Sequence, residues 1–193
     1  CQDQITQSQK ITRLQRQSNL GGLTRFTFAS LTSTGKSEDT QTQKRYSQAY
    51  EAALSYADKP ETWLLMTGAS GSGKTHFLAA IITKVIDQDL QAFYISVPDL
   101  LDHLRSTFTP STEISYDQLF EHLRTVPVLA LDDLGSHATT PWAQEKLNQI
   151  LSHRFNSQLP TVISLSVPVR QLEPQLRARL EDKNVVTHVS LGV

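Results

Sequence analysis

The chain has 193 residues, of which 38% are hydrophobic, and this length suits one globular domain with at most a small appendage. Its formal net charge of −1 excludes a protein that coats nucleic acid by bulk electrostatics, so any contact with DNA would have to come from local patches. The single cysteine excludes an internal disulfide, and no apolar run approaches the roughly 20 residues that span a bilayer, so we expect a cytoplasmic protein that does not contact a membrane.

Residues 1–24 form a polar, glutamine-rich stretch, which we interpret as an arm or linker before a domain at residues 25–193. Three basic residues are spaced for one side of a helix: Lys10, Arg13 and Arg16. The stretch is either a docking arm for a partner or for DNA phosphate, or a solvated tether. Because the chain opens on Cys1 where a methionine is expected, we expect an upstream part to be missing. Cys1 is then either the end of an absent cysteine cluster or a plain free thiol.

The region before the first strand begins at the break Gly21-Gly22. Residues 23–31 alternate weakly between apolar and polar, and the polar stretch 32–42 predicts a loop. Apolar residues then recur at helical spacing up to Pro60, which ends the helix. These residues are Tyr46, Ala49, Ala53 and Tyr56.

Residues 68–75 read GASGSGKT and lie between the apolar run 63–66, which predicts a strand, and residues 76–86, which predict a helix. The stretch fits G-x-x-x-x-G-K-[ST] at every fixed position and in the required context. Its glycines allow backbone N–H groups to converge on phosphate oxygens, helped by the positive end of the following helix. The alternative is a Gly/Ser-rich turn that happens to contain Lys-Thr.

A phosphate loop gives particular side chains particular roles. Lys74 would reach the β- and γ-phosphates of ATP, and Thr75 would give its hydroxyl to Mg²⁺. Upstream, Phe26 and Phe28 belong either to a segment that wraps the adenine or to the core. We therefore expect ATP and Mg²⁺ as cofactors, with the nucleotide bound by Gly68, Ala69, Ser70, Gly71, Ser72, Gly73, Lys74, Thr75 and His76.

The rest of the chain alternates strands with helices in short units. This alternation predicts an α/β fold with a five-stranded parallel sheet flanked by helices on both faces. After the phosphate loop, we expect strands at residues 91–97, 126–131, 160–166 and 185–191, and helices at 98–108, 116–124, 142–155 and 172–180.

Two acidic residues, Asp132 and Asp133, follow four apolar residues and have the form of a Walker B strand. Such a strand places carboxylates at the carboxyl edge of the sheet, near the phosphates. Asp132 would hold Mg²⁺, directly or through water, and Asp133 would orient or deprotonate the attacking water. At the end of the next strand, Ser166 either senses the γ-phosphate or helps to position the water, or it is an ordinary strand-end serine.

Two arginines, Arg177 and Arg179, lie two positions apart on a predicted helix. They are about 200° apart around an axis with 3.6 residues per turn, so they cannot both face one target. One of them would reach the nucleotide of a neighbouring subunit as an arginine finger, and at least one is a surface arginine in water.

The order of these motifs resembles that of a known family. GASGSGKTH, LALDDLG, the helix WAQEKLNQIL, PTVISLS and LRARL follow one another as in the DnaC/IstB-like branch of AAA+ ATPases. That branch includes bacterial replicative helicase loaders and the ATPase helpers of transposition. The resemblance covers roughly residue 26 to the C-terminus. It implies an AAA+ core with ATP between subunits, and it assigns the finger to Arg179.

The same resemblance carries further expectations. Residues 98–108 match the helix that contacts single-stranded DNA in initiator-type AAA+ proteins. Ser166 stands where the family usually has a sensor asparagine, which puts strong γ-phosphate sensing in doubt. Asp133 replaces the glutamate of many AAA+ enzymes, as is frequent in this branch, and implies slow hydrolysis. We expect little or no C-terminal lid after Val193.

Motifs and resemblance together predict a helicase loader, which is an ATP-hydrolysing AAA+ protein that self-associates, binds single-stranded DNA and acts on a ring helicase. Hydrolysis would be slow, stimulated by DNA or the partner. Within the family, the alternative is a transposition helper that binds duplex DNA and a transposase. From a different class, the alternative is a small-molecule P-loop kinase, although Arg177-Ala178-Arg179 is brief for the Arg-rich lid of such an enzyme.

Overall fold

The structure is a computed structural model that describes residues 12–35, 37–106, 116–135 and 140–191. Its centre is a sheet of five parallel strands in the order β2-β3-β4-β1-β5. The strands are β1 (Trp63–Thr67), β2 (Ala92–Ser96), β3 (Val128–Leu134), β4 (Thr161–Leu165) and β5 (Val186–Ser190). The predicted α/β class and five-stranded parallel sheet are therefore confirmed.

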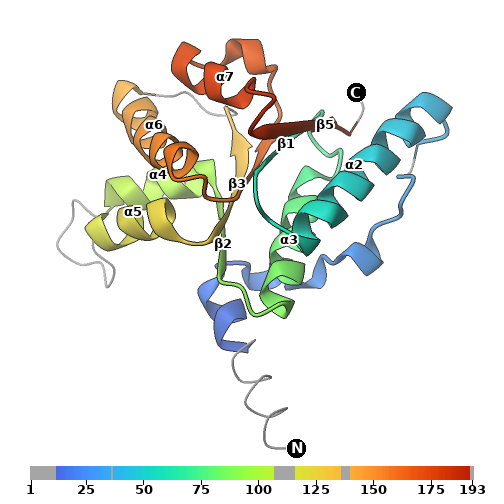
Figure 1. Cartoon of the computed structure of the whole chain (residues 1–193), viewed down its shortest axis with the longest axis horizontal. Helices are drawn as coiled ribbons and strands as arrows, with labels where there is room; N and C mark the ends of the chain where they lie inside the picture. Colours follow the sequence, from blue (N-terminus) through green and yellow to red (C-terminus); the bar gives the residue numbers. More distant parts are fainter. Residues whose placement is uncertain (1–11, 36, 107–115, 136–139, 192–193) are drawn as a thin grey trace, which may run out of the picture.

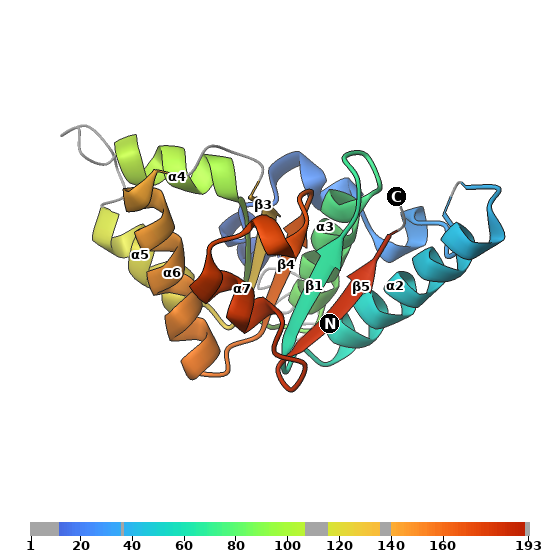
Figure 2. The same ribbon diagram turned by 90° about the horizontal axis from the view of Figure 1, so that it is seen from above.

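Helices cover both faces of the sheet (Figures 1 and 2). One face carries α2 (Thr40–Asp58) and α3 (Lys74–Asp87), whose apolar residues form one core cluster with the sheet. The other face carries α4 (Val97–Ser106), α5 (Tyr116–Thr125), α6 (Pro141–Asn156) and α7 (Pro174–Leu180), which contribute to a second cluster. Among the described residues, none of the helices has the length and apolar character needed to cross a membrane.

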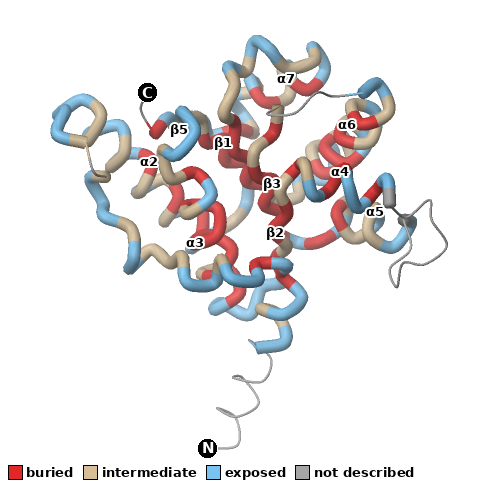
Figure 3. The backbone as a smooth tube through the Cα atoms, turned by 180° about the vertical axis from the view of Figure 1, so that it is seen from behind, coloured by how far each residue is buried: buried red, intermediate tan, exposed pale blue. Residues whose placement is uncertain are grey.

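The central strands are buried on both faces, as expected for a parallel sheet between two helical layers (Figure 3). All five residues of β4 and the first five of β3 are buried. This burial explains why the strands appear in the sequence as continuous apolar runs instead of alternating ones.

Side-chain caps set the starts of α2, α6 and α7. The Asp39 side chain accepts a hydrogen bond from the Thr42 amide at 2.7 Å and begins α2 inside the stretch predicted as a loop. Thr140 accepts one from the Ala143 amide at 3.2 Å and begins α6, with Pro141 in the first position. The helix predicted at 172–180 starts two residues later as α7, because Glu173 caps it and Pro174 takes its first position; a 3₁₀ turn (Val169–Gln171) lies before it.

The region before α2 has no strand in its described part. It contains two 3₁₀ turns, η1 (Gly21–Arg25) and η2 (Phe28–Ser30). Phe26 and Phe28 are partly buried against the cluster of α2 and α3, which is the core role considered for them. The expected arm at residues 1–24 lies partly outside the described residues, including Cys1 and Lys10, and its separation from the ATPase domain stays a prediction.

Candidate nucleotide site

The stretch 68–75 forms a turn between β1 and α3 at the carboxyl edge of the sheet (Figure 1). Gly71 and Gly73 have φ angles of 81° and 101°, which glycine adopts at little cost. Gly73 is the N-cap of α3, and as a glycine it has no side chain that could accept a hydrogen bond from the helix. The first N–H groups of this helix therefore have no side-chain acceptor at the cap and are available to an anion.

The side chain of Lys74 folds back onto the loop. Its side chain is buried, and Nζ donates to the carbonyl oxygens of Gly68 and Ala69 at 2.8 Å each. Burial lowers the pKa of Lys74, while the carboxylates of Asp133 and Asp132 oppose that shift. The ammonium group is thus within electrostatic range of the two predicted acids, although its hydrogen bonds are to the loop.

Asp132 is at the centre of a cluster of hydroxyl groups. Only 4% of the residue is exposed, and its Oδ2 accepts hydrogen bonds from Thr75 Oγ1 and from the Tyr94 hydroxyl, each at 2.7 Å. Its Oδ1 accepts a hydrogen bond from Ser164 Oγ. The predicted metal ligands, Thr75 and Asp132, are therefore in direct contact although 57 residues separate them.

Asp133 occupies an irregular point of β3. The pairing of β3 with β4 shifts register between Leu131 and Leu134, and Asp133 has a φ of 60°. Its amide donates to Ser164 Oγ, and its Oδ1 accepts a hydrogen bond from Ser166 Oγ, both at 2.8 Å. The strand therefore runs through both acids, three residues beyond the predicted end, and the irregularity turns Asp133 towards β4 instead of burying it.

A hollow of about 520 Å³ opens beside the loop. One wall consists of residues 69–73 and His76, and the other comes from the segment before α2 and from α2 itself, including Gly35, Thr42 and Tyr46. The Tyr46 hydroxyl lies 3.7 Å from the position that a Cβ on Gly73 would occupy, so the tyrosine reaches the rim of the loop.

His76 connects this wall to η2. Its Nε2 lies 2.9 Å from Ser30 Oγ and 3.3 Å from the Thr27 carbonyl oxygen, and its ring lies 4.5 Å from that of Phe26. Burial lowers the pKa of His76, with the Thr27 carbonyl opposing the shift. The imidazole therefore holds η2 against the start of α3.

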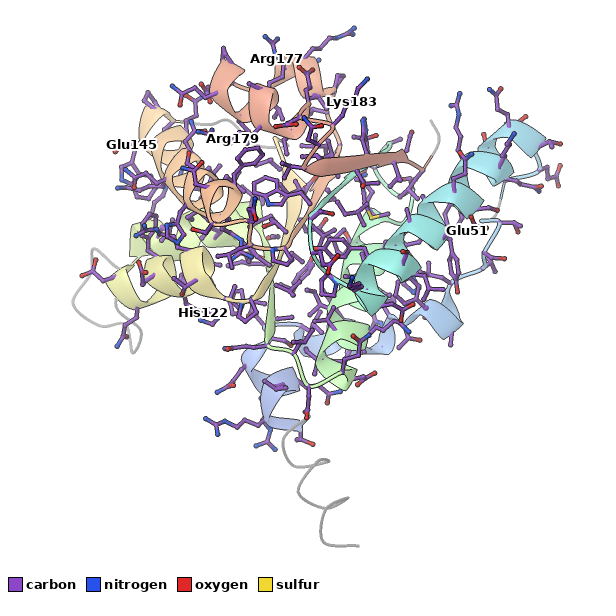
Figure 4. The ribbon with its side chains drawn as sticks, in the orientation of Figure 1. Glu51, His122, Glu145, Arg177, Arg179 and Lys183 are labelled. Carbon is purple, nitrogen blue, oxygen red and sulfur yellow. The ribbon has the colours of Figure 1, made fainter. Side chains whose placement is uncertain are left out.

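The structure brings five predicted side chains to one edge of the sheet: Lys74, Thr75, Asp132, Asp133 and Ser166. The predicted arginines lie elsewhere, on α7 (Figure 4). Both are half-buried, neither lines the hollow, and Arg179 Nη1 donates to the Gln175 carbonyl oxygen at 3.2 Å.

Sequence reasoning did not assign roles to three residues of this site. Tyr94 lies in a strand that looks like core, Ser164 lies within another, and Tyr46 belongs to an apolar helical stripe. A polar residue inside an otherwise apolar run was the only available signal for Ser164, and the tyrosines gave none.

These residues fit a magnesium nucleotide. The loop presents the first N–H groups of α3 and a lysine, and Ser72 Oγ is buried without a hydrogen-bond partner in the described part of the chain, as expected of a group that awaits an anion. Thr75 and Asp132 supply two oxygens 2.7 Å apart, close to the roughly 3 Å expected of neighbouring ligands at about 2.1 Å from Mg²⁺.

Three comparisons with known proteins bear on this site. The family model described as IstB-like ATP binding protein matches residues 5–185. Among curated proteins, the chain is 31% identical to the replicative helicase loader DnaI of Bacillus subtilis over 102 residues, which are 52% of this chain and 32% of DnaI. It is 27% identical to the replicative helicase loader DnaC of Escherichia coli K12 over 119 residues, which are 62% of this chain and 48% of DnaC.

Solved structures share the fold. A crystal structure of the DnaC helicase loader superposes with a TM-score of 0.69 at 19% identity, covering 86% of this chain and 97% of that chain. In the sequence comparisons, the matched region spans about a third of the length of DnaI from Bacillus subtilis and about half of the length of DnaC from Escherichia coli.

Proposed function

The chain belongs to the family of IstB-like ATP-binding proteins, in the DnaC/IstB-like branch of AAA+ ATPases, and from this premise we propose that it hydrolyses ATP with Mg²⁺ and loads a replicative ring helicase onto single-stranded DNA. The observation that carries the proposal is the contact between Thr75 Oγ1 and Asp132 Oδ2. It joins the phosphate loop to the acidic end of β3, and a nucleotide-driven protein needs both at one point.

The side chains around this contact divide the work of hydrolysis. Magnesium bound with ATP would offset the charge of the phosphates. Lys74 would exchange its two carbonyl acceptors for phosphate oxygens, which are stronger acceptors for an ammonium group. Asp133 would orient the attacking water, and Ser166 holds its Oδ1 at 2.8 Å, so the serine would act through the carboxylate as well as by contact with phosphate.

Self-association would supply an arginine, which one chain does not place at its own nucleotide site. Neither Arg177 nor Arg179 lines the hollow beside the phosphate loop. An arginine that completes the charge of the site would therefore come from a neighbouring subunit, and we assign this role to Arg179. ATP would then favour assembly, and its cleavage would favour release.

Binding to single-stranded DNA is part of the proposal, but α4 offers little charge for it in its described residues. Its exposed charges are Asp99, Asp102 and Arg105, and Arg105 is paired with Asp102 at 3.2 Å. Phosphate would compete with Asp102 for that arginine. Residues 107 and 108 of the predicted DNA-contacting helix lie outside the described residues.

The proposal is tested by capture of the cell's replicative helicase on the immobilised intact protein, with ATP, with ADP and without nucleotide. We expect capture that depends on nucleotide and is lost in Lys74→Ala, which removes the ammonium group from the loop. Helicase capture that is equal in wild type and variant under all conditions would refute the ATP-switched loader.

The alternative within the family is a transposition helper, which the IstB-like description of the matching family favours. The two functions differ in the nucleic acid that they require. Salt-sensitive, ATP-dependent binding to single strands supports the loader, whereas equal affinity for duplex DNA supports the transposition helper. Family membership makes a small-molecule kinase the least favoured of the three.

A further inference from the structure

Tyr94 on β2 is a buried tyrosine whose hydroxyl group has one acceptor, the magnesium ligand proposed above. The residue is 7% exposed, and its hydroxyl donates to Asp132 Oδ2 at 2.7 Å. A phenol ordinarily titrates at about pH 10, so the hydroxyl group is protonated and is a donor at physiological pH.

The three hydroxyl groups at Asp132 are not equivalent. A carboxylate oxygen has two lone pairs. Ser164 uses one of them on Oδ1, while Tyr94 and Thr75 share Oδ2. Thr75 can keep its hydrogen bond to Oδ2 and still bind a metal through a lone pair of its own oxygen. Tyr94 and Ser164 hold the two carboxylate oxygens from the neighbouring strands, and they fix the plane of the carboxylate beside Thr75, where the metal would bind.

Tyr94 is itself held by the segment that precedes the ATPase core. Its amide donates to the Ser18 carbonyl oxygen at 2.8 Å, and its carbonyl oxygen accepts from Asn19 Nδ2 at 2.9 Å. Leu20, the next residue, is 2% exposed and packs in the same apolar cluster as Tyr94. Both main-chain groups of this edge-strand residue are thus paired with residues 18–19.

We propose that Tyr94 is a positioning residue that holds the Asp132 carboxylate for magnesium, and that residues 18–20 hold Tyr94 in turn. Movement of the segment before the core would then alter how well the site binds the metal. This inference rests on the proposed function, because it assumes a magnesium nucleotide at the loop.

The test compares two tyrosines. Tyr94→Phe removes the hydroxyl that contacts Asp132, and Tyr56→Phe is the matched control: Tyr56 is also 7% exposed, but its hydroxyl has no hydrogen-bond partner in the described part of the chain. Binding of a fluorescent ATP analogue is titrated at a series of Mg²⁺ concentrations and in excess EDTA. Urea unfolding of both variants confirms that they are folded.

We expect Tyr94→Phe to raise the Mg²⁺ concentration at half-effect about 10-fold or more, as found for groups that orient metal ligands. Binding in EDTA should stay unchanged, and Tyr56→Phe should match wild type in both conditions. Ser164→Ala provides a second route should Tyr94→Phe not fold, and it should shift the Mg²⁺ requirement in the same direction. An unchanged or lower Mg²⁺ requirement in the folded variants would overturn the role of Tyr94.

Asn19→Ala tests the second half of the proposal. It removes the side chain that holds the Tyr94 carbonyl group without touching the site, and it should raise the Mg²⁺ requirement by less than Tyr94→Phe does. A Mg²⁺ requirement equal to that of wild type would remove the segment from the proposal. Absence of ATP binding by wild type would instead refute the proposed function, so the two failures are distinguishable.

Discussion

Gly135, two residues beyond Asp133, offers the sharpest test of how the acidic end of β3 is held. Its φ is +87°, and a Cβ there would lie 2.7 Å from Val167 Cγ2 and 3.0 Å from Leu172 Cδ2. Gly135→Ala therefore combines a left-handed backbone, at about 1–2 kcal/mol, with displacement of two apolar side chains, at about 1–3 kcal/mol. We expect the free energy of unfolding to fall by about 2–5 kcal/mol.

Urea unfolding followed by circular dichroism measures this change. The control is Gly21→Ala, because Gly21 also has a positive φ of +52° but a Cβ there would meet nothing within 4 Å. The control should show the backbone cost alone, about 1–2 kcal/mol. Equal effects of the two substitutions would refute the packing argument. Because Val167 follows Ser166, Gly135→Ala should also weaken the hold on Asp133 and slow ATP turnover.

Four further predictions concern the site and the core. Asp133→Asn should keep ATP affinity within a few-fold while reducing turnover about 100-fold or more in a phosphate-release assay, and full turnover would exclude Asp133 as the base. Arg179→Ala should keep ATP binding and abolish the rise of specific activity with protein concentration, whereas Arg177→Ala should not. Arg154 of α6 is fully buried, and its guanidinium group donates to Thr161 Oγ1 and to several carbonyl oxygens. Arg154→Lys should lower the free energy of unfolding by about 3 kcal/mol or more in urea, because an ammonium group cannot reach all of these acceptors. Burial lowers the pKa of His76 and of His122, so below pH 6.5 the unfolded chain binds more protons than the folded chain does. The free energy of unfolding should therefore fall as the pH is lowered from 7.5 to 5.5. The fall should be less steep in His76→Gln.

Much of the fold could be predicted because its signals are local. The strands β1 to β4 are each built on a short apolar run, and two helices begin at a side-chain cap followed by a proline, as Thr140 and Pro141 mark the start of α6. The ends of elements were harder to predict where a tertiary contact decides them. The strand β3 runs on to Leu134, where Asp133 is hydrogen-bonded to Ser164 of β4 and to Ser166, which follows β4, and no feature of the local sequence predicts these contacts.

The charge of Arg154 shows the same limit. In sequence it is one cation near the end of an amphipathic helix, a position typical of the surface. In the structure it has no exposed surface and donates to Thr161 Oγ1 and to the carbonyl oxygens of Leu123, Val126 and Pro160. Burial lowers its pKa to about 10, so the guanidinium group remains charged at neutral pH while it joins α6 to α5, to the turn before β3 and to the start of β4.

By itself, the sequence determined the phosphate loop and the alternation of strands and helices, because glycine conformations, helix caps and apolar runs act within a few residues. Only the tertiary structure decided which hydroxyl groups surround Asp132. Tyr94 lies 38 residues before it and Ser164 lies 32 residues after it. They meet because the strand order places β3 between β2 and β4, and the carboxyl ends of parallel strands lie at one edge of the sheet.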